Sequence, residues 1–137
     1  MADQITKALV VRTLAPGESH PLLPSIVSLT HVQNTGAAFG LFKGQQIVFI
    51  VLSLIVIGWL LWELRAQHPL APMVRWGSAL MLGGAAGNVI DRLRLGYVTD
   101  FLDFHVWPVF NIGDSAITIG VGLLLFHSIK GTRTPQR

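Results

Sequence analysis

An apolar stretch over residues 47–64 places the strongest limit on how this chain can fold, because Ser53 is its only polar interruption before Glu63. Eighteen residues in a helix extend about 27 Å at a rise of about 1.5 Å per residue. That length is close to the hydrocarbon thickness of a bilayer. Trp59 and Trp62 near its end are typical of the aromatic belt at a membrane surface. The stretch therefore predicts a membrane-spanning helix.

Two later segments have the same character. Residues 73–90 are mostly apolar and rich in small side chains, and residues 112–129 carry one acid, Asp114, near their start. Hydrophobic residues make up 51% of the chain and charged residues 12%, which is about half the charged share of soluble domains. The net charge of +3 forms no basic stripe, so nothing indicates nucleic-acid binding. The chain is predicted to be an integral membrane protein.

Small residues are spaced along the two later segments. Gly83 and Gly87 form a GxxxG pattern, and Ala116 and Gly120 form a second small pair. In lipid, such pairs let helices approach closely. The glycines either serve packing alone or also clear space near a substrate, and both interpretations stay open.

The first residues predict a helix that is too short to span. Residues 2–14 extend about 20 Å as a helix, less than the hydrocarbon core of about 30 Å. The segment is either a surface helix or the end of a spanning helix whose beginning is missing.

The longest polar region, residues 15–46, predicts a small sheet on the membrane face. Prolines break any helix early, and residues 25–31 alternate and are β-branched, which predicts a strand. Asn34 and Gly36 indicate a turn, because both residue types tolerate a positive φ. Residues 37–42 are expected to form a second strand or a short interfacial helix.

Basic residues near the helix ends do not by themselves orient the chain. Those on the side of the chain's tail are Arg65, Arg75, Lys130, Arg133 and Arg137. Those toward the other side are Lys7, Arg12, Lys43, Arg92 and Arg94. If Lys7 and Arg92 belong to a site and are discounted, the tail side is weakly favoured as cytoplasmic.

Acidic residues gather between the second and third apolar segments. Four of the chain's seven carboxylates lie there, namely Asp91, Asp100, Asp103 and Asp114. Charge beside membrane-spanning helices is costly, which makes it a functional hypothesis. Asn88, Asp91 and Arg92 would share one face of a helix. Arg92 would pair with Asp91 or with another carboxylate, and a plain ion cluster at a helix end is the simpler interpretation of Asp91.

Asp100 and Asp114 are the candidates for acid–base chemistry. Asp114 follows Asn111 by three residues at the head of an apolar segment, which is also the pattern of a helix N-cap. Asp100 is flanked by apolar residues and not by turn residues. Two carboxylates brought together at a dry interface cannot both ionise, and one keeps a proton, so the pair supplies an acid and a base.

Other catalytic chemistries fit less well. The chain has no cysteine, its five histidines lack a metal-ligand spacing, and none of its three lysines is near Ser28 or Ser115. We therefore expect no metal and no cofactor.

Five short blocks follow one another along almost the whole chain. They are DQITK at 3–7, NTGAAFG at 34–40, GGAAGNVIDR at 83–92, GYVTDF at 96–101 and FNIGDS at 110–115. In this order the blocks resemble those of the lipoprotein signal peptidase (signal peptidase II) family. Gly113 stands where that family usually has alanine, a change of one small residue for another.

The resemblance implies an aspartic endopeptidase of the bacterial inner membrane that removes the signal peptide of prolipoproteins, cutting before the diacylglyceryl-modified cysteine. It implies an all-α polytopic fold, a four-helix transmembrane bundle with cytoplasmic termini, a small extracytoplasmic β-sheet and an active site on the extracytoplasmic side.

One domain over residues 1–137 would then contain a partial first span at about 1–14 and full spans at 47–64, 73–90 and 112–129. Residues 15–46 and 91–111 would be the extracytoplasmic segments. Because the family's first span begins well before the DQITK block, we expect further apolar residues upstream of Met1.

The resemblance also assigns residues. The catalytic dyad maps onto Asp100 and Asp114, whereas Asp103 matches no catalytic position. Supporting polar positions map onto Asp3, Lys7, Asn34, Asn88, Asp91, Arg92 and Asn111. The implied partners are diacylglyceryl-modified prolipoproteins and membrane lipid, with no nucleic acid, and the protein is expected to be a monomer.

Two other functions would use the same features. A proton-coupled transporter or channel subunit would also place Asp91, Asp100 and Asp114 at a membrane site, although the internal repeats common in transporters are not visible. A non-catalytic assembly subunit would use only the small-residue faces. Cleavage of a lipidated precursor distinguishes the peptidase from both, whereas counter-ion flux in liposomes would favour the transporter.

Overall fold

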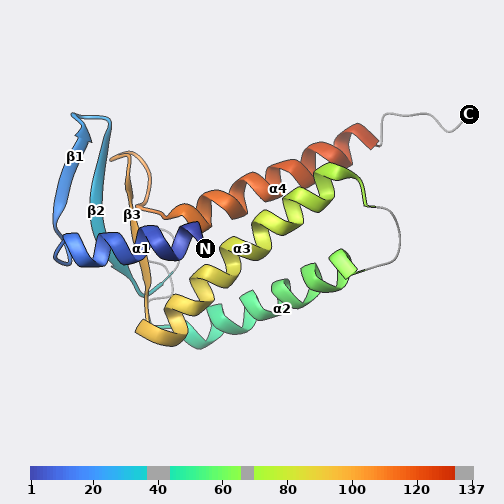
Figure 1. Ribbon diagram of the computed structural model, residues 1–137, viewed down its shortest axis with the longest axis horizontal. Coiled ribbons are helices and arrows are strands. Elements are labelled where there is room, and N and C mark those ends of the chain that lie inside the picture. Colours follow the sequence, from blue (N-terminus) through green and yellow to red (C-terminus); the bar gives the residue numbers. More distant parts are fainter. Residues whose placement is uncertain (37–43, 66–69, 132–137) are drawn as a thin grey trace, which may run out of the picture.

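The computed structural model describes residues 1–36, 44–65 and 70–131. Within them the helices and strands are, in order, α1 (Ala2–Thr13), β1 (Ser19–Leu23), β2 (Val27–Asn34), α2 (Gln46–Arg65), α3 (Pro72–Leu95), β3 (Val98–Asp103) and α4 (Ile112–Gly131). The helices α2, α3 and α4 form one end of the molecule, and α1 and the sheet form the other (Figure 1).

The predicted helices are present with small changes at their ends. Among the described residues, α2 and α4 are long and apolar enough to cross a membrane. Between them lies α3, which packs against both. It runs five residues beyond the predicted end at 90, so Asp91 and Arg92 lie on its last turns and not in the following segment. Gly96, with a left-handed φ of 78°, ends the helix.

Glycines set the close packing of α3 on α4, including Gly120 of the second predicted pair but not Gly83 of the first. A Cβ at Gly84 would overlap the carbonyl oxygen of Gly113, and a Cβ at Gly77 would lie 2.9 Å from the carbonyl oxygen of Gly120. A Cβ at Gly83 would meet nothing within 4 Å. The prediction of a packing role for Gly83 was therefore wrong, because this residue faces away from α4.

The sheet is antiparallel, with the order β1-β2-β3. The predicted strand at 25–31 is β2, shifted to Val27–Asn34. The strands β1 and β3 were not predicted, because β1 contains a proline and all its residues are exposed, whereas β3 carries two aspartates. Residues 37–42, and Lys43, Arg133 and Arg137 of the charge comparison, lie outside the described residues.

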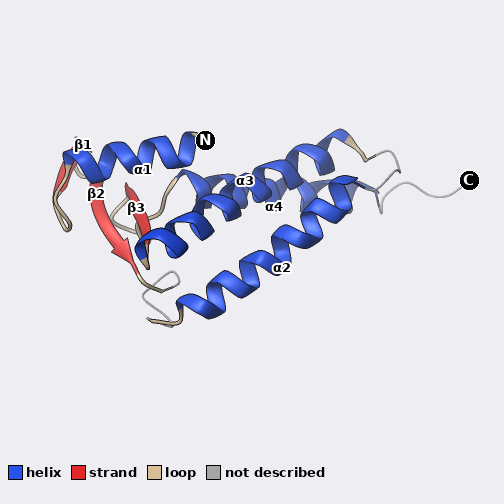
Figure 2. Cartoon of the chain, turned by 60° about the horizontal axis from the view of Figure 1, so that its bottom comes forward, coloured by secondary structure: helices blue, strands red, loops and turns tan. Residues whose placement is uncertain are grey.

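Helix α1 packs on this sheet, at the same end of the molecule in both views (Figure 1 and Figure 2). Val10, Leu14 and Phe101 form the buried apolar core between them. The ring N–H of buried His31 in β2 lies 2.9 Å from the Leu14 carbonyl, to which it can donate. These contacts fix the end of α1 against the strand that carries Asn34.

The glycine packing gives a matched pair of variants. Gly84→Ala should lower the thermal unfolding midpoint of the purified protein in detergent, because the new methyl group must push apart two backbones. Overpacking of this kind costs about 1–3 kcal/mol. Gly83→Ala should leave the midpoint unchanged or raise it, since alanine favours helix more than glycine does. Equal midpoints for the two variants would contradict the packing described.

Candidate active site

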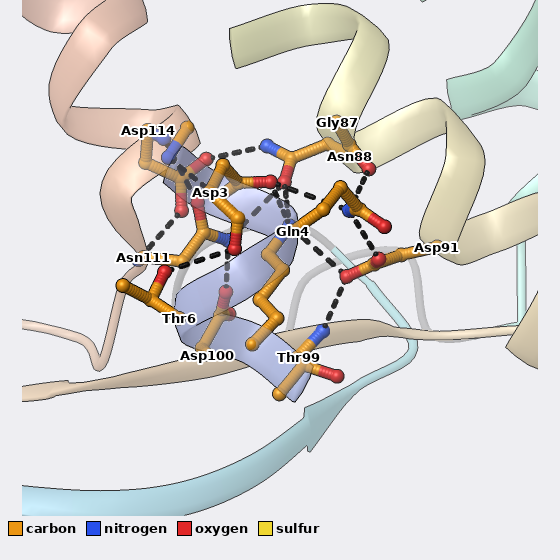
Figure 3. Close-up of polar contacts among 12 residues, drawn as sticks. Asp3, Gln4, Thr6, Gly87, Asn88, Asp91, Thr99, Asp100, Asn111 and Asp114 are labelled. Carbon is orange, nitrogen blue, oxygen red and sulfur yellow. Dashed lines mark hydrogen bonds and ion pairs between the residues drawn. The ribbon is translucent and has the colours of Figure 1, made fainter. Parts of the chain in front are cut away.

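Asp100 lies on β3, where the sheet meets the end of the molecule formed by α2, α3 and α4. It lies opposite Val32 of β2 and is 2% exposed. Both of its carboxylate oxygens accept amide hydrogen bonds, from Asn34 Nδ2 at 2.9 Å and from Asn111 Nδ2 at 2.6 Å. The two amides come from different elements, so they fix the carboxylate in one orientation. Figure 3 shows Asp100 beside Asn111.

Asp114 lies in the first turn of α4 and takes part in a capping box. Asn111 is the N-cap, because its Oδ1 accepts the backbone N–H of Asp114 at 2.9 Å. Asp114 Oδ2 accepts the backbone N–H of Asn111 in return, at 3.2 Å. Asp114 is therefore not the N-cap of α4 but its partner in the capping box, which corrects the N-cap interpretation. The carboxylate accepts a second hydrogen bond at Oδ1, from Asn88 Nδ2 at 2.8 Å, so it also faces α3.

Asn111 joins the two acids. Its side chain is fully buried, and its Nδ2 donates both to Asp100 and, at 3.2 Å, to Asn88 Oδ1. Asp100 and Asp114 line one cavity of about 260 Å³ together with Asn34, Asn88 and Arg92. The structure therefore brings together the two carboxylates that the resemblance assigned as a dyad.

Arg92 lines the same cavity without a carboxylate partner. Its guanidinium lies 5.1 Å from the centroid of the Phe49 ring, and its buried Nε has no hydrogen-bond partner. Within the described residues no ion pair joins Arg92 to Asp91 or to another acid, so the expected pairing is not found. The guanidinium thus lines the cavity, where the charges of Asp114, Asp100 and Asp91 act on it without an ion pair among the described residues.

A buried ammonium group organises the opposite side of the site. Lys7 Nζ lies 2.9 Å from Asp3 Oδ2, 3.0 Å from Asp91 Oδ2 and 2.8 Å from Asn88 Oδ1. All four side chains are buried. Asp3 and Lys7 share one face of α1 at a spacing of four residues. Asp91 is therefore part of an ion cluster near the end of α3, and that cluster is buried.

Three further contributors were not predicted. Gln4 Nε2 donates to Asp91 Oδ1 at 2.9 Å, the Thr99 backbone N–H donates to Asp91 Oδ2 at 3.0 Å, and the Gly113 backbone N–H donates to Asp3 Oδ1 at 2.8 Å. Gln4 lies inside the DQITK block, which was a signal for it. The other two act through backbone atoms, which the residue type does not reveal.

A larger apolar groove of about 570 Å³ begins at Asp114. Its walls come from the loop before α4 and from the first turns of α4, and they include Phe104, Val106, Trp107, Phe110 and Ile119. An apolar chain bound there would end beside the acid pair. In the part of the chain that the structure describes, no three acidic or histidine side chains are grouped as metal ligands would be.

The environment of Asp100 favours its protonated form. Burial raises the pKa of this carboxyl group from 3.8 to about 7, and the negative charge of Asp114 acts in the same direction. The hydrogen bonds from Asn34 and Asn111 oppose the increase. At neutral pH the pair can therefore hold one proton, and an acid and a base stand at one cavity.

Sequence comparison places the chain in a family. Residues 1–130 match the family model for Signal peptidase (SPase) II. The chain belongs to the signal peptidase II family. A relative from Halothermothrix orenii, named lipoprotein signal peptidase, is 44% identical over 93% of this chain and 87% of its own length. A relative of the same name from Moorella thermoacetica is 48% identical over 91% and 83%.

Two solved structures have a similar fold. A bacterial membrane enzyme determined by the in meso method superposes with a TM-score of 0.92 and 31% identity, covering 99% of this chain and 87% of that one. A second such enzyme gives a TM-score of 0.85 and 32% identity, covering 94% and 86%. The membrane character inferred from the apolar segments is thus shared with experimental structures.

The raised pKa of Asp100 predicts how the stability of this signal peptidase II depends on pH. As the pH rises from about 4, the unfolded chain loses the Asp100 proton first, whereas the folded protein keeps it until about pH 7. The free energy of unfolding should therefore fall with rising pH across this window, by at most about 1.4 kcal/mol per pKa unit.

Unfolding midpoints of the wild-type protein and of Asp100→Asn, measured from pH 4 to pH 8, test this prediction. The variant has no proton to lose at this position and should show a smaller decline. Parallel profiles would mean that the pKa of Asp100 does not differ between the folded and unfolded states.

Asn34 offers a test of how the dyad is held. Asn34→Ala removes one amide donor from Asp100 but little packing, so it should lower the turnover of a lipidated precursor at least tenfold while the unfolding midpoint shifts only a few degrees. If activity and folded protein are lost in parallel, Asn34 acts only as a turn residue.

Proposed function

We propose that Asp100 and Asp114 are the catalytic dyad with which this protein removes the signal peptide from bacterial prolipoproteins, cutting before the diacylglyceryl-modified cysteine. The observation that carries the proposal is the meeting of the buried carboxylate of Asp100 and the half-buried carboxylate of Asp114 at one cavity, joined through the amide of Asn111. The activity carried by the names of the relatives, lipoprotein signal peptidase, requires hydrolysis of a peptide bond.

The dyad hydrolyses a peptide by sharing one proton. The ionised carboxylate takes a proton from water as the water oxygen adds to the carbonyl carbon, and the protonated carboxyl group donates its proton to the carbonyl oxygen. Collapse of the tetrahedral intermediate breaks the C–N bond, and a proton passes to the leaving amine. Asp100, whose pKa is about 7, is suited to hold the shared proton before the reaction.

The amides and Arg92 orient the reacting groups. Asn34 and Asn111 hold Asp100, and Asn88 holds Asp114. Arg92 lines the cavity with its charge unpaired by a carboxylate, so we assign it to the carbonyl groups of the bound precursor. The buried side chains of Asp3, Lys7 and Asp91 hold Asn88 and the two segments that carry the acids in place.

The apolar groove beside Asp114 suits a lipidated substrate. A diacylglyceryl-modified cysteine carries its acyl chains directly next to the bond that is cut. An apolar surface that leads to the acids would place that bond at the dyad, because removing hydrocarbon from water is favourable by about 25 cal/mol per Å².

The proposal extends to the placement of the chain in the membrane. We propose that residues 1–137 are one domain and that α2, α3 and α4 span the inner membrane. The region of α1, as the partial first span, would be the fourth member of the bundle. The acids lie at the end of the bundle that carries the sheet, which would be extracytoplasmic. Both acids come from one chain, so a monomer embedded in lipid suffices, without nucleic acid or a cofactor.

Substitution of each acid tests the dyad. Asp100→Asn and Asp114→Asn should each reduce cleavage of a diacylglyceryl-modified precursor by at least 10³-fold while the protein still folds, because each residue depends on the other. The double variant should be scarcely worse than either single variant, since residues that act as a unit are not additive.

The matched control is Glu63→Gln, which removes a carboxylate on α2 that is outside the site. Cleavage is followed with purified variants in detergent or in bilayers. Near-normal turnover by Asp100→Asn or by Asp114→Asn, in protein of normal stability, would show that the dyad is misassigned.

A further inference from the structure

The loop of residues 104–110, between β3 and α4, forms walls of both hollows beside the acids. Phe104, Trp107 and Phe110 line the apolar groove, and Trp107 and Phe110 also line the catalytic cavity. Yet Val106 is 92% exposed and Trp107 is 61% exposed, so burial of the loop tip in a core does not hold it in place. Its position must come from other contacts.

The two ends of the loop are joined by backbone hydrogen bonds. The Phe110 N–H donates to the Leu102 carbonyl at 3.1 Å, and the Leu102 N–H donates to the Phe110 carbonyl at 2.8 Å. The rings of Phe104 and Phe110 stack with their centroids 5.7 Å apart. These contacts fix the base of the loop, and at its tip the Val106 N–H donates to the Phe104 carbonyl at 2.7 Å.

His105 is held in a conformation that few side-chain-bearing residues adopt. Its φ is 61°, in the left-handed region, which costs free energy and persists only where the surroundings impose it. Its backbone N–H donates to Asp103 Oδ1 at 2.8 Å, and its ring lies 3.2 Å from Ser28 Oγ and 3.5 Å from Asp103 Oδ1. Contacts from β2 and β3 therefore determine the turn of the loop.

A chain of polar contacts extends these constraints across the sheet. Asp103 Oδ2 accepts the hydroxyl of Thr30 at 3.0 Å, and the hydroxyl of Thr30 lies 2.8 Å from that of Ser19. We refer to Ser19, Ser28, Thr30, Asp103 and His105 together as the clasp. All three strands contribute to it, so the loop is fastened to the whole sheet.

The order Ser28–His105–Asp103 is also that of a nucleophilic triad, but the burial argues against this chemistry. Ser28 is 6% exposed and lies within β2, directly opposite Asp103 in the register. A substrate carbonyl cannot approach its hydroxyl without separating the two strands. The cluster therefore positions other groups and does not itself react.

We propose that the clasp sets the position of residues 104–110 and thereby shapes the groove that receives the apolar part of the substrate, with His105 as a positioning residue. The inference rests on the proposed function for its substrate but on the geometry above for the loop. Because the clasp is separate from Asp100 and Asp114, its loss should weaken substrate binding and leave the chemical step largely intact.

The experiment compares His105→Ala and Asp103→Ala with His20→Ala. His20 is the matched control, an exposed histidine of the same sheet that pairs with Glu18 at 2.9 Å and lies away from the groove. With a diacylglyceryl-modified precursor, the two clasp variants should raise KM three- to tenfold and change kcat less than twofold. His20→Ala should change neither constant.

A second readout follows the loop directly. In a background with Trp59, Trp62 and Trp76 replaced by phenylalanine, Trp107 is the only tryptophan. Acrylamide should quench its fluorescence at least 1.5-fold more efficiently in the clasp variants than in their parent or in His20→Ala. If Asp103→Ala does not fold, Ser28→Ala, which removes a single hydroxyl contact, replaces it.

The outcomes separate this proposal from the assignment of the dyad. A fall in kcat at constant KM, or identical Trp107 quenching in all folded variants, overturns the clasp. If the parent protein cleaves no precursor, the proposed function fails, whereas the Trp107 measurement still decides whether the clasp positions the loop.

Discussion

The site depends on one buried ammonium group. Lys7 Nζ has three hydrogens to donate, and the structure supplies three oxygen acceptors, from Asp3, Asp91 and Asn88, each within 3.0 Å. Burying such charges costs several kcal/mol per ion, and only good geometry with satisfied hydrogen bonds offsets that cost. The cluster therefore adds little to the free energy of unfolding, but it restricts α1 and α3 to one relative arrangement.

That arrangement is transmitted to both acids through neighbouring residues. The second oxygen of Asp3 holds the backbone N–H of Gly113, and Asp91 holds the backbone N–H of Thr99. Gly113 and Thr99 immediately precede Asp114 and Asp100 in the chain. The third acceptor, Asn88, turns its amide N–H group toward Asp114 because its oxygen is engaged by Lys7. The partners of Lys7 thus hold the residue before each acid, and one of them, Asn88, also contacts Asp114 directly.

The long apolar helices could be predicted from the sequence, whereas the elements that depend on tertiary contacts were missed. Long apolar runs had to become helices, so α2, α3 and α4 were found within a few residues of their ends. Strand β3 was missed, because it carries two aspartates, and one of them, Asp100, is buried through tertiary contacts that no local pattern shows. One residue turns a helix by about 100°, so the GxxxG pattern indicated Gly83 where Gly84 makes the contact. The pairing of Asp100 with Asp114 rested on the family resemblance, since residues 14 apart meet only through the fold.

The same geometry ties the acid pair to the docking of the sheet on the bundle. Asp100 belongs to β3 and Asp114 to α4, and Asn111 reaches both from the start of α4. Burial, which raises the pKa of Asp100 most, exists only while α1 and the sheet cover the end of the bundle. If the sheet moved away, solvent would reach the carboxylate and Asp100 would ionise like an ordinary aspartate. The proton that the proposed reaction needs is therefore held by the assembled fold, and not by either half alone.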